Sequence, residues 1–161
     1  MRPYTATELC QLDGRSCFGC CGRKWGTKEE VLSQIQKNTD ELVQIKERTQ
    51  FRLRSEPDDL PHGSCRNLVY DGTTAKTCCP LHPARNEGKD LRVGHCDIYY
   101  LCPTAKKFNV WERDKQERFI AFLRKHDDKV YEYSMKMDQN WYLKQFKKEE
   151  QGEKLVISSS L

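Results

Sequence analysis

Residues 10–22 read CQLDGRSCFGCCG, and this stretch decides how the rest of the chain is interpreted. It places Cys17 and Cys20 in a C-x2-C turn, with Cys10 upstream and Cys21 directly after Cys20. A C-x2-C turn is typical of metal sites, because its two sulfurs are able to converge on one metal. Thiolate is a soft ligand that selects zinc, copper(I) or iron–sulfur clusters.

A second group of cysteines follows after a long charged segment. Its members are Cys65, Cys78, Cys79, Cys96 and Cys102. The two groups hold all nine cysteines of the 161-residue chain, and this odd count disagrees with a closed disulfide framework. The N-terminus also lacks the apolar run of about 7–15 residues that marks a secretory signal. We therefore expect a cytoplasmic protein with reduced thiols, and we favour metal ligation over disulfides or unrelated thiols.

Two pairs of adjacent cysteines, Cys20-Cys21 and Cys78-Cys79, limit how the thiols are shared. Neighbouring side chains point to opposite sides of an extended chain, and they also diverge in a turn. The two members of a pair are therefore not expected to bind one tetrahedral metal together. Eight of the nine thiols suffice for two four-cysteine sites, and one site with spare structural thiols is the alternative.

Two histidines are candidate metal ligands of lower weight than the cysteines. His82 lies in the stretch CPLHP that begins at Cys79, and His95 directly precedes Cys96. Each is able to replace a thiolate, although a histidine that only makes hydrogen bonds is the commoner case. A catalytic pair of Cys96 with His82 is a further alternative, less favoured because clustered thiols more often bind metal.

The sequence predicts a single domain, mainly α, with a loop-rich cysteine-cluster metal region and a small β-hairpin. The metal region comprises residues 10–26 and 65–102, and Asp71-Gly72 marks the hairpin turn. A capping box, Thr27 with Glu30, predicts a helix over 27–54. Apolar periodicity predicts a second helix over 110–150, continuous or broken near 127–128 or 138–139.

The simplest arrangement of these two predicted helices is a long antiparallel pair, an arm that extends from the metal region. Residues 151–161 are expected to form a frayed tail.

Composition limits the partners and the size of the core. Only 37% of the residues are hydrophobic and 32% are charged, so a modest core needs a metal or disulfide staple. The net charge of +4 is spread over interspersed acids and bases, which makes nucleic acid an unlikely partner. No stretch approaches the roughly 20 apolar residues of a membrane span. We expect the partner to be another protein, bound through the helical arm.

The cysteine pattern resembles one known family. The matching segments are C10-x6-C17-x2-C20-C21, Cys65-Arg66-Asn67-Leu68, Asp71-Gly72 leading to Cys78-Cys79-Pro80-Leu81-His82, Gly94-His95-Cys96, and Cys102. Together they resemble the CxxCxxCC, or YkgJ-like, cysteine-cluster proteins. The resemblance covers about residues 10–102 and implies a domain that chelates zinc or iron. Similar lysine N-methylases that act on flagellin carry an iron–sulfur cluster.

The residues that match this family best are Cys17, Cys20, Cys21, Cys65, Cys79, Cys96 and Cys102. Cys10 matches less well, and either Cys78 or Cys79 is the extra thiol.

The expected cofactor is an iron–sulfur cluster, most simply [4Fe–4S], with zinc as the alternative. Both take four cysteines, and the small residues around Cys17, Cys20 and Cys21 suit a cluster held by a tight loop and distant cysteines. Two functions follow. In the first, the protein is a redox or accessory component linked to protein modification. In the second, it is a structural zinc-binding interaction module. Whether the chain is an enzyme stays open, because the only nucleophiles that stand out are the thiols.

Overall fold

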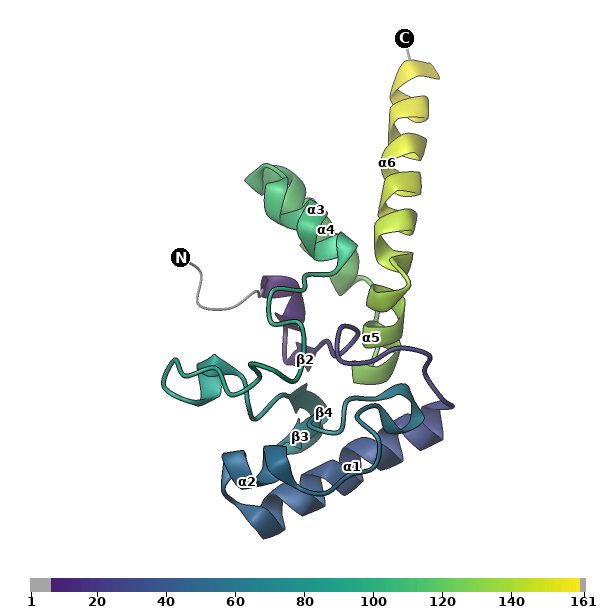
Figure 1. The fold of residues 1–161 in the computed structure, drawn as a ribbon. Coiled ribbons are helices and arrows are strands. Elements are labelled where there is room, and N and C mark those ends of the chain that lie inside the picture. The colour runs from purple at the N-terminus through teal and green to yellow at the C-terminus, as the bar shows by residue number, and fades with distance from the viewer. Residues whose placement is uncertain (1–6, 160–161) are drawn as a thin grey trace.

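The structure is a computed structural model that describes residues 7–159, apart from the side chains of residues 74, 75 and 155–159. The chain forms two regions, one above the other in Figure 1. The lower region holds α1 (Lys28–Ile45), α2 (Arg48–Leu53), β3 (Val69–Asp71) and β4 (Thr73–Cys78). The upper region holds β1 (Gln11–Leu12), β2 (Arg15–Ser16), α3 (Pro103–Val110), α4 (Arg113–Arg124), α5 (Val130–Asp138) and α6 (Trp141–Ser159). The predicted mainly helical, loop-rich fold with a small hairpin is confirmed.

The first predicted helix begins where the sequence places it but ends earlier. Both hydrogen bonds of the capping box between Thr27 and Glu30 are present. The helix ends at Ile45, because Lys46 adopts a left-handed conformation with φ of +64°. The Glu47 carboxylate then accepts hydrogen bonds from two backbone amides and starts α2. The prediction of one helix over 27–54 is therefore wrong for its last turns.

The apolar side of α1 packs on the hairpin, so the predicted antiparallel helix pair is wrong. Val31 and Ile35 share the lower core with Leu68, which lies at the start of the hairpin. The Asn38 side chain donates hydrogen bonds to the backbone oxygens of Cys65 (3.2 Å) and Leu68 (2.9 Å). The apolar side of α1 thus covers a strand and a cysteine loop instead of a partner helix (Figure 1).

The second predicted helix is divided into separate segments. Residues 125–129 separate α4 from α5, and Gln139 and Asn140 separate α5 from α6, so the breaks near 127–128 and 138–139 are confirmed. The chain also breaks between α3 and α4, where Glu112 is the N-cap of α4. Helix α3 begins at Pro103, seven residues before the predicted helix start at residue 110. Proline in the first turn has the dihedral angle that a helix needs.

Aromatic side chains form most of the upper core. Phe119 is fully buried and contacts the rings of Phe108, Trp111, Phe122 and Phe146, with centroids 5.1–6.1 Å apart. The helices α3, α4 and α6 all contribute to this ring cluster, which also receives residues from the N-terminal segment. The upper region therefore has a core of its own that does not depend on the hairpin.

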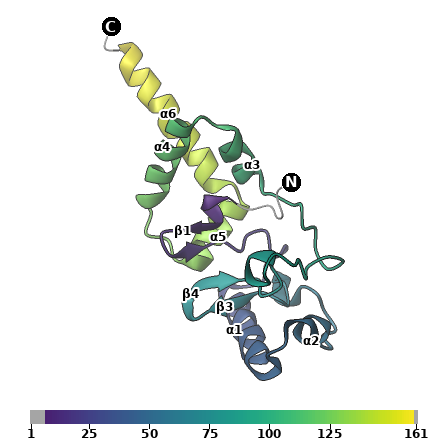
Figure 2. The ribbon, with the colours of Figure 1, turned by 90° about the vertical axis from the view of Figure 1, so that its left-hand side faces the viewer.

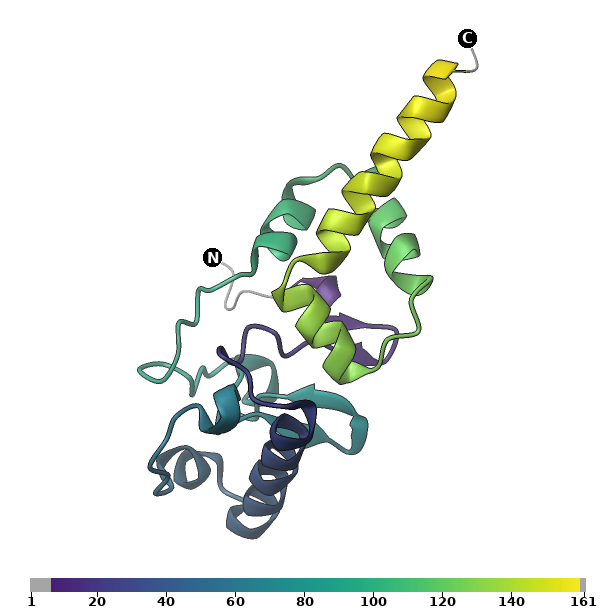
Figure 3. The same cartoon turned by 90° about the vertical axis from the view of Figure 1, so that its right-hand side faces the viewer.

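The C-terminal part of α6 projects away from the rest of the molecule (Figure 3). It remains helical to Ser159, which corrects the prediction of a frayed tail from residue 151; residues 160 and 161 lie outside the described part. Within residues 7–159, no helix is both long enough and apolar enough to cross a membrane.

Candidate metal centre

The N-terminal cysteines are positioned by a short hairpin. β1 and β2 pair antiparallel, with Gln11 opposite Ser16, around a turn in which Asp13 and Gly14 both have positive φ. Cys10 and Cys17 flank the open end of this hairpin, and the Cys17 amide donates a hydrogen bond to the Cys10 oxygen (3.0 Å). The six-residue spacing between these cysteines therefore brings them side by side.

The loop that follows is attached to α5. The Phe18 amide donates to Ser134 Oγ (3.0 Å), and the Phe18 ring is fully buried. Gly19 approaches α5 so closely that a Cβ atom there would lie 2.7 Å from the Ser134 oxygen. Only glycine fits at this position, so Gly19, the second residue between Cys17 and Cys20, sets the path of the chain toward Cys20.

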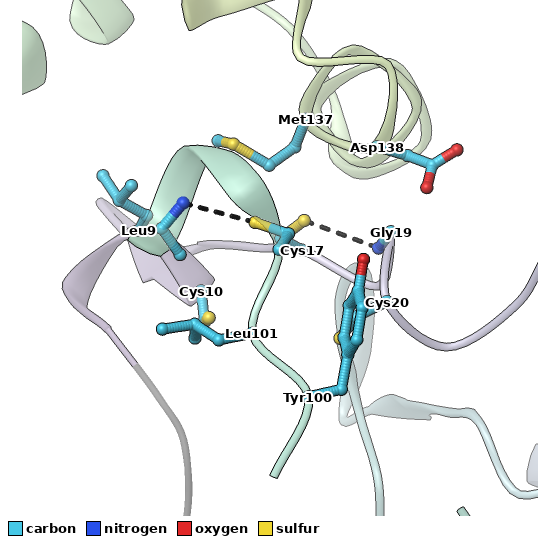
Figure 4. A pocket seen from close by; sticks show the side chains of 11 residues that line it. Leu9, Cys10, Cys17, Gly19, Cys20, Tyr100, Leu101, Met137 and Asp138 are labelled. Atoms are coloured by element: carbon cyan, nitrogen blue, oxygen red, sulfur yellow. Dashed lines mark hydrogen bonds between the residues drawn. The ribbon is translucent and has the colours of Figure 1, made fainter. Parts of the chain in front are cut away.

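Four cysteines, which we call the upper group, line one cavity beside the upper core. They are Cys10, Cys17, Cys20 and Cys102. The cavity has a volume of about 40 Å³, and its remaining lining includes Leu9, Leu101 and Met137. Figure 4 shows Cys10, Cys17 and Cys20 around this space, with Met137 and Asp138 of α5 on the far side. The N-terminal segment and the start of α3, which are far apart in sequence, thus contribute sulfur to one small space.

Cys102 reaches this cavity because it caps a helix. It is the N-cap residue of α3, and its sulfur accepts a hydrogen bond from the Ala105 amide (3.4 Å). The Cys17 sulfur accepts one from the Gly19 amide (3.5 Å). Such bonds favour the thiolate over the thiol, and in iron–sulfur proteins they tune the reduction potential of the cluster.

Four other cysteines, the lower group, lie beside the hairpin. They are Cys21, Cys65, Cys79 and Cys96, and charge on one of these thiols acts on others of the group. The Cys65 amide donates to the Cys21 oxygen (2.7 Å), and Gly22 forms an isolated β-bridge with Ser64. The Cys65 sulfur accepts from the Asn67 amide (3.4 Å), in the same i to i+2 pattern as Cys17 with Gly19. Backbone contacts thus join two members of this group.

The other two members come from the ends of the following loop. Cys79 directly follows β4, and its sulfur accepts a hydrogen bond from the Leu81 amide. Cys96 lies next to His95, whose Nε2 atom is 3.6 Å from the Cys65 sulfur. Figure 2 shows this loop running from the hairpin toward α3. Its regular structure is limited to the 3₁₀ turn Pro83–Arg85.

Burial keeps most of the thiols protonated in the absence of a metal. It raises the pKa of Cys79 to about 12, and charge on Cys65 or Cys96 adds to this shift. Burial likewise raises the pKa of Cys17, and charge on Cys20, Cys10 or Cys102 raises it further. A metal therefore has to displace protons when it binds, which makes its affinity depend on pH.

Cys20 behaves differently from the other thiols. A hydrogen bond from the Cys21 side chain lowers the Cys20 pKa to about 7, and the positive charge of Arg92 acts in the same direction. Donating this bond raises the pKa of Cys21. Arg92 itself is held by Asp90, whose carboxylate accepts from the guanidinium at 2.7 and 2.9 Å.

The side chains as they stand surround space without converging on a point. Among the described residues, no three histidine, cysteine or carboxylate side chains lie close enough together to hold a metal ion. All nine cysteines are free thiols. Binding a metal therefore requires the sulfurs to turn inward about their Cα–Cβ bonds. The donor chemistry fits a soft metal, because the cavity and its hydrogen-bonded sulfurs come from cysteine.

The remaining predicted candidates lie around these groups. His82 Nδ1 accepts a hydrogen bond from Ala84 and caps its own turn. The Nε2 atom of His95 contacts both the Cys65 sulfur and the side-chain nitrogen of Asn67 (3.0 Å), so it is placed to orient a sulfur ligand. Cys78 ends β4 opposite Val69; the charges that act on its thiol belong to Arg85, Asp71 and Arg48.

Sequence reasoning missed several residues that shape this site. Asn67 and Arg92 were not singled out, and neither was the role of Cys102 as a helix cap. The signal for Asn67 is its place two residues after Cys65, where an amide reaches the sulfur. The signal for Cys102 is Pro103, which favours the first turn of a helix. Arg92 has no such local signal.

No family model, curated protein or solved structure matches this chain. The resemblance to the CxxCxxCC family therefore stays a prediction.

Proposed function

We propose that the protein binds metal through its cysteines, carries an iron–sulfur cluster, and serves as a redox or accessory component linked to modification of another protein. The observation that carries the proposal is the cavity lined by Cys10, Cys17, Cys20 and Cys102. Cysteines from the N-terminal segment and from the start of α3 line it, and the sulfurs of Cys17 and Cys102 accept backbone hydrogen bonds that favour thiolate.

The cavity supports a cluster over a single ion. A metal ion bonded directly to four sulfurs, at about 2.3 Å for zinc, fills the space between them. The space of about 40 Å³ exceeds the roughly 10–15 Å³ that one water needs. Its apolar lining by Leu9, Leu101 and Met137 also suits a cluster, because solvent exposure and nearby hydrogen bonds set the reduction potential.

A structural zinc centre is the second candidate, and the loop of residues 79–102 favours it. This loop contains one 3₁₀ turn, and the lower group takes sulfur from Cys79 and Cys96 near its ends. A closed zinc site contributes folding energy directly to such a segment. In this case the protein is an interaction module without catalysis.

We assign the protein partner to the projecting part of α6 and the compartment to the cytoplasm. The helix is anchored as far as Glu150, whose carboxylate pairs with Lys115 (3.1 Å) and Arg118 (3.2 Å) of α4. Beyond Glu150 the helix extends past α4 (Figure 3), so this stretch is available for another protein. The cytoplasm suits the proposal because it keeps thiols reduced.

The test is metal and acid-labile sulfide analysis of the full chain purified without oxygen. A brown protein with equal amounts of iron and sulfide supports the cluster. A colourless protein that contains zinc selects the structural candidate. A chain with neither metal, before and after anaerobic reconstitution with iron, sulfide or Zn²⁺, overturns both.

A further inference from the structure

We infer that the cysteines form two separate metal centres that meet at the peptide bond between Cys20 and Cys21. The upper group makes one centre and the lower group makes the other, while Cys78 belongs to neither. The inference rests on the proposed metal-binding function and assigns its ligands. Each centre has the four thiolates that one tetrahedral zinc ion or one [4Fe–4S] cluster requires.

The first observation is that the two groups pack on different hydrophobic cores. Cys17 and Cys102 pack against the upper core, which is formed by α3 to α6 and the N-terminal segment. Cys21 and Cys65 pack against the lower core, which contains Phe18, Val31 and Leu68. A side chain held against one core is not free to join ligands on the other. The cores thus hold Cys17 and Cys102 at one place and Cys21 and Cys65 at another.

The second observation is the path of the chain at the junction. The Cys21 amide donates to the Phe18 oxygen (2.7 Å), which closes a tight turn through Gly19 and Cys20. On one side, Gly19 lies against α5 and Cys20 lines the upper cavity. On the other side, the Cys21 oxygen accepts from the Cys65 amide of the lower region. Cys20 thus lines the upper cavity while Cys21 packs on the lower core, so we assign them to different centres even though their thiols share a hydrogen bond in the metal-free chain.

The third observation concerns charge. Four thiolates around a zinc ion or a cluster carry net negative charge, and a nearby cation offsets it. Arg92 lies where its positive charge acts on Cys20 of the upper group and on Cys79 and Cys96 of the lower group. The side chain of Arg92 is largely buried and fixed by Asp90. The charge of one guanidinium therefore acts on members of both groups.

Cys78 provides the matched control. It is the last residue of β4, directly before Cys79, but its partner across the strands is Val69 and the charges that act on its thiol include Arg85 and Asp71. Its thiol is half-buried, like those of Cys65 and Cys79. Replacing Cys78 thus removes a thiol of similar burial without removing a proposed ligand.

The direct test is a thiol-protection map of the full chain loaded with Zn²⁺ as the probe. The reduced chain is titrated with Zn²⁺, its mass is measured under native conditions, and the complex is treated with iodoacetamide before peptide mapping. We expect two zinc ions per chain, alkylation at Cys78, and protection of the eight other cysteines. One zinc ion with four protected cysteines overturns the inference and leaves the metal-binding function standing. No bound zinc and nine reactive cysteines overturn the binding of zinc itself.

Paired variants then test the division of the ligands. We expect Cys10→Ser with Cys102→Ser, and separately Cys65→Ser with Cys79→Ser, each to reduce bound zinc by half. Cys78→Ser should keep the full amount. The inference fails if one double variant loses all of the zinc while the other loses none. If both lose all of it because the chain unfolds, the protection map of the unaltered chain decides.

Discussion

The upper and lower regions of the molecule differ in how much core each one possesses. The upper core joins four helices through a cluster of aromatic rings, and it includes Tyr133 and Tyr142, both fully buried. The lower core is smaller and is built around Phe18, Val31, Ile35 and Leu68. After Cys79 the chain continues into a loop with little regular structure. We therefore expect packing to hold the upper region, and we expect the lower region to depend on its proposed metal centre.

The largest effect expected from this comparison is the loss of the lower centre. Structural zinc sites contribute roughly 10–16 kcal/mol of apparent binding free energy, which is as large as the whole stability of a typical domain. With Cys65→Ser and Cys79→Ser, we expect α1 and the hairpin to lose their protection from hydrogen exchange while α4 and α6 keep theirs. Cys78→Ser is the control. Full protection of α1 in the double variant would show that packing alone holds the lower region.

The next effect is expected in the upper core. Phe119→Ala removes a fully buried ring that contacts four other aromatic rings, and such changes cost about 3–5 kcal/mol. Denaturant unfolding followed by Trp fluorescence measures the loss. Val43→Ala, at a residue that is 67% exposed, should change stability by less than about 0.5 kcal/mol. Equal small effects from both variants contradict a packed upper core.

A smaller effect is expected at Asn38, which joins α1 to the cysteine loop. Asn38→Ala leaves the backbone oxygens of Cys65 and Leu68 without their side-chain donor, at a cost of about 1–3 kcal/mol. The control is Gln36→Ala, which removes only an exposed hydrogen bond to Asp40. Thermal unfolding of the two variants should separate them clearly. If Asn38→Ala matches the control, the contact between α1 and the cysteine loop does not stabilise the lower region.

Cys20 of the upper group and Cys79 of the lower group also differ in reactivity when the metal is absent. The pKa of Cys20 is lowered to about 7 and that of Cys79 is raised to about 12. A lowered pKa means that Cys20 is thiolate above about pH 7, while Cys79 stays protonated there. The metal-free chain should therefore be alkylated first at Cys20, with a rate that rises through neutral pH.

The control for this reactivity is Cys21→Ala, which removes the hydrogen bond to Cys20. In this variant the rise in alkylation rate should shift to higher pH. Equal rates at Cys20 and Cys79 in the unaltered chain contradict the assigned environments.

Local patterns in the sequence predict those elements that depend on neighbouring residues. The capping box at Thr27, the Asp71-Gly72 hairpin and the breaks on either side of α5 are all of this kind. The partner of α1 could not be predicted this way, because an apolar stripe fits a strand as well as a helix. The end of α1 at Ile45 was also hidden, since its sequence continues with good helix formers and Lys46 gives no sign of its positive φ.

For the candidate site, the sequence predicts that cysteines are the ligands, and this stays a prediction; the expected divergence of Cys20 from Cys21 is wrong for the thiols, which share a hydrogen bond. From the sequence alone, one metal centre and two metal centres both remain open. The division into groups depends on which core each sulfur packs against, and this follows from contacts between segments far apart in sequence. Cys102 shows this best, because it follows the whole lower group in the chain and yet lies beside Cys10 and Cys17.

The central claim is that these thiols bind metal, and the mass of the native chain tests it most directly. The full chain is purified without oxygen and measured under native conditions, before and after treatment with acid. The account predicts a mass excess that corresponds to bound metal, with or without sulfide, and that disappears in acid as the thiols regain their protons. A native mass equal to that of the bare chain, unchanged after reconstitution with iron and sulfide or with Zn²⁺, would contradict it.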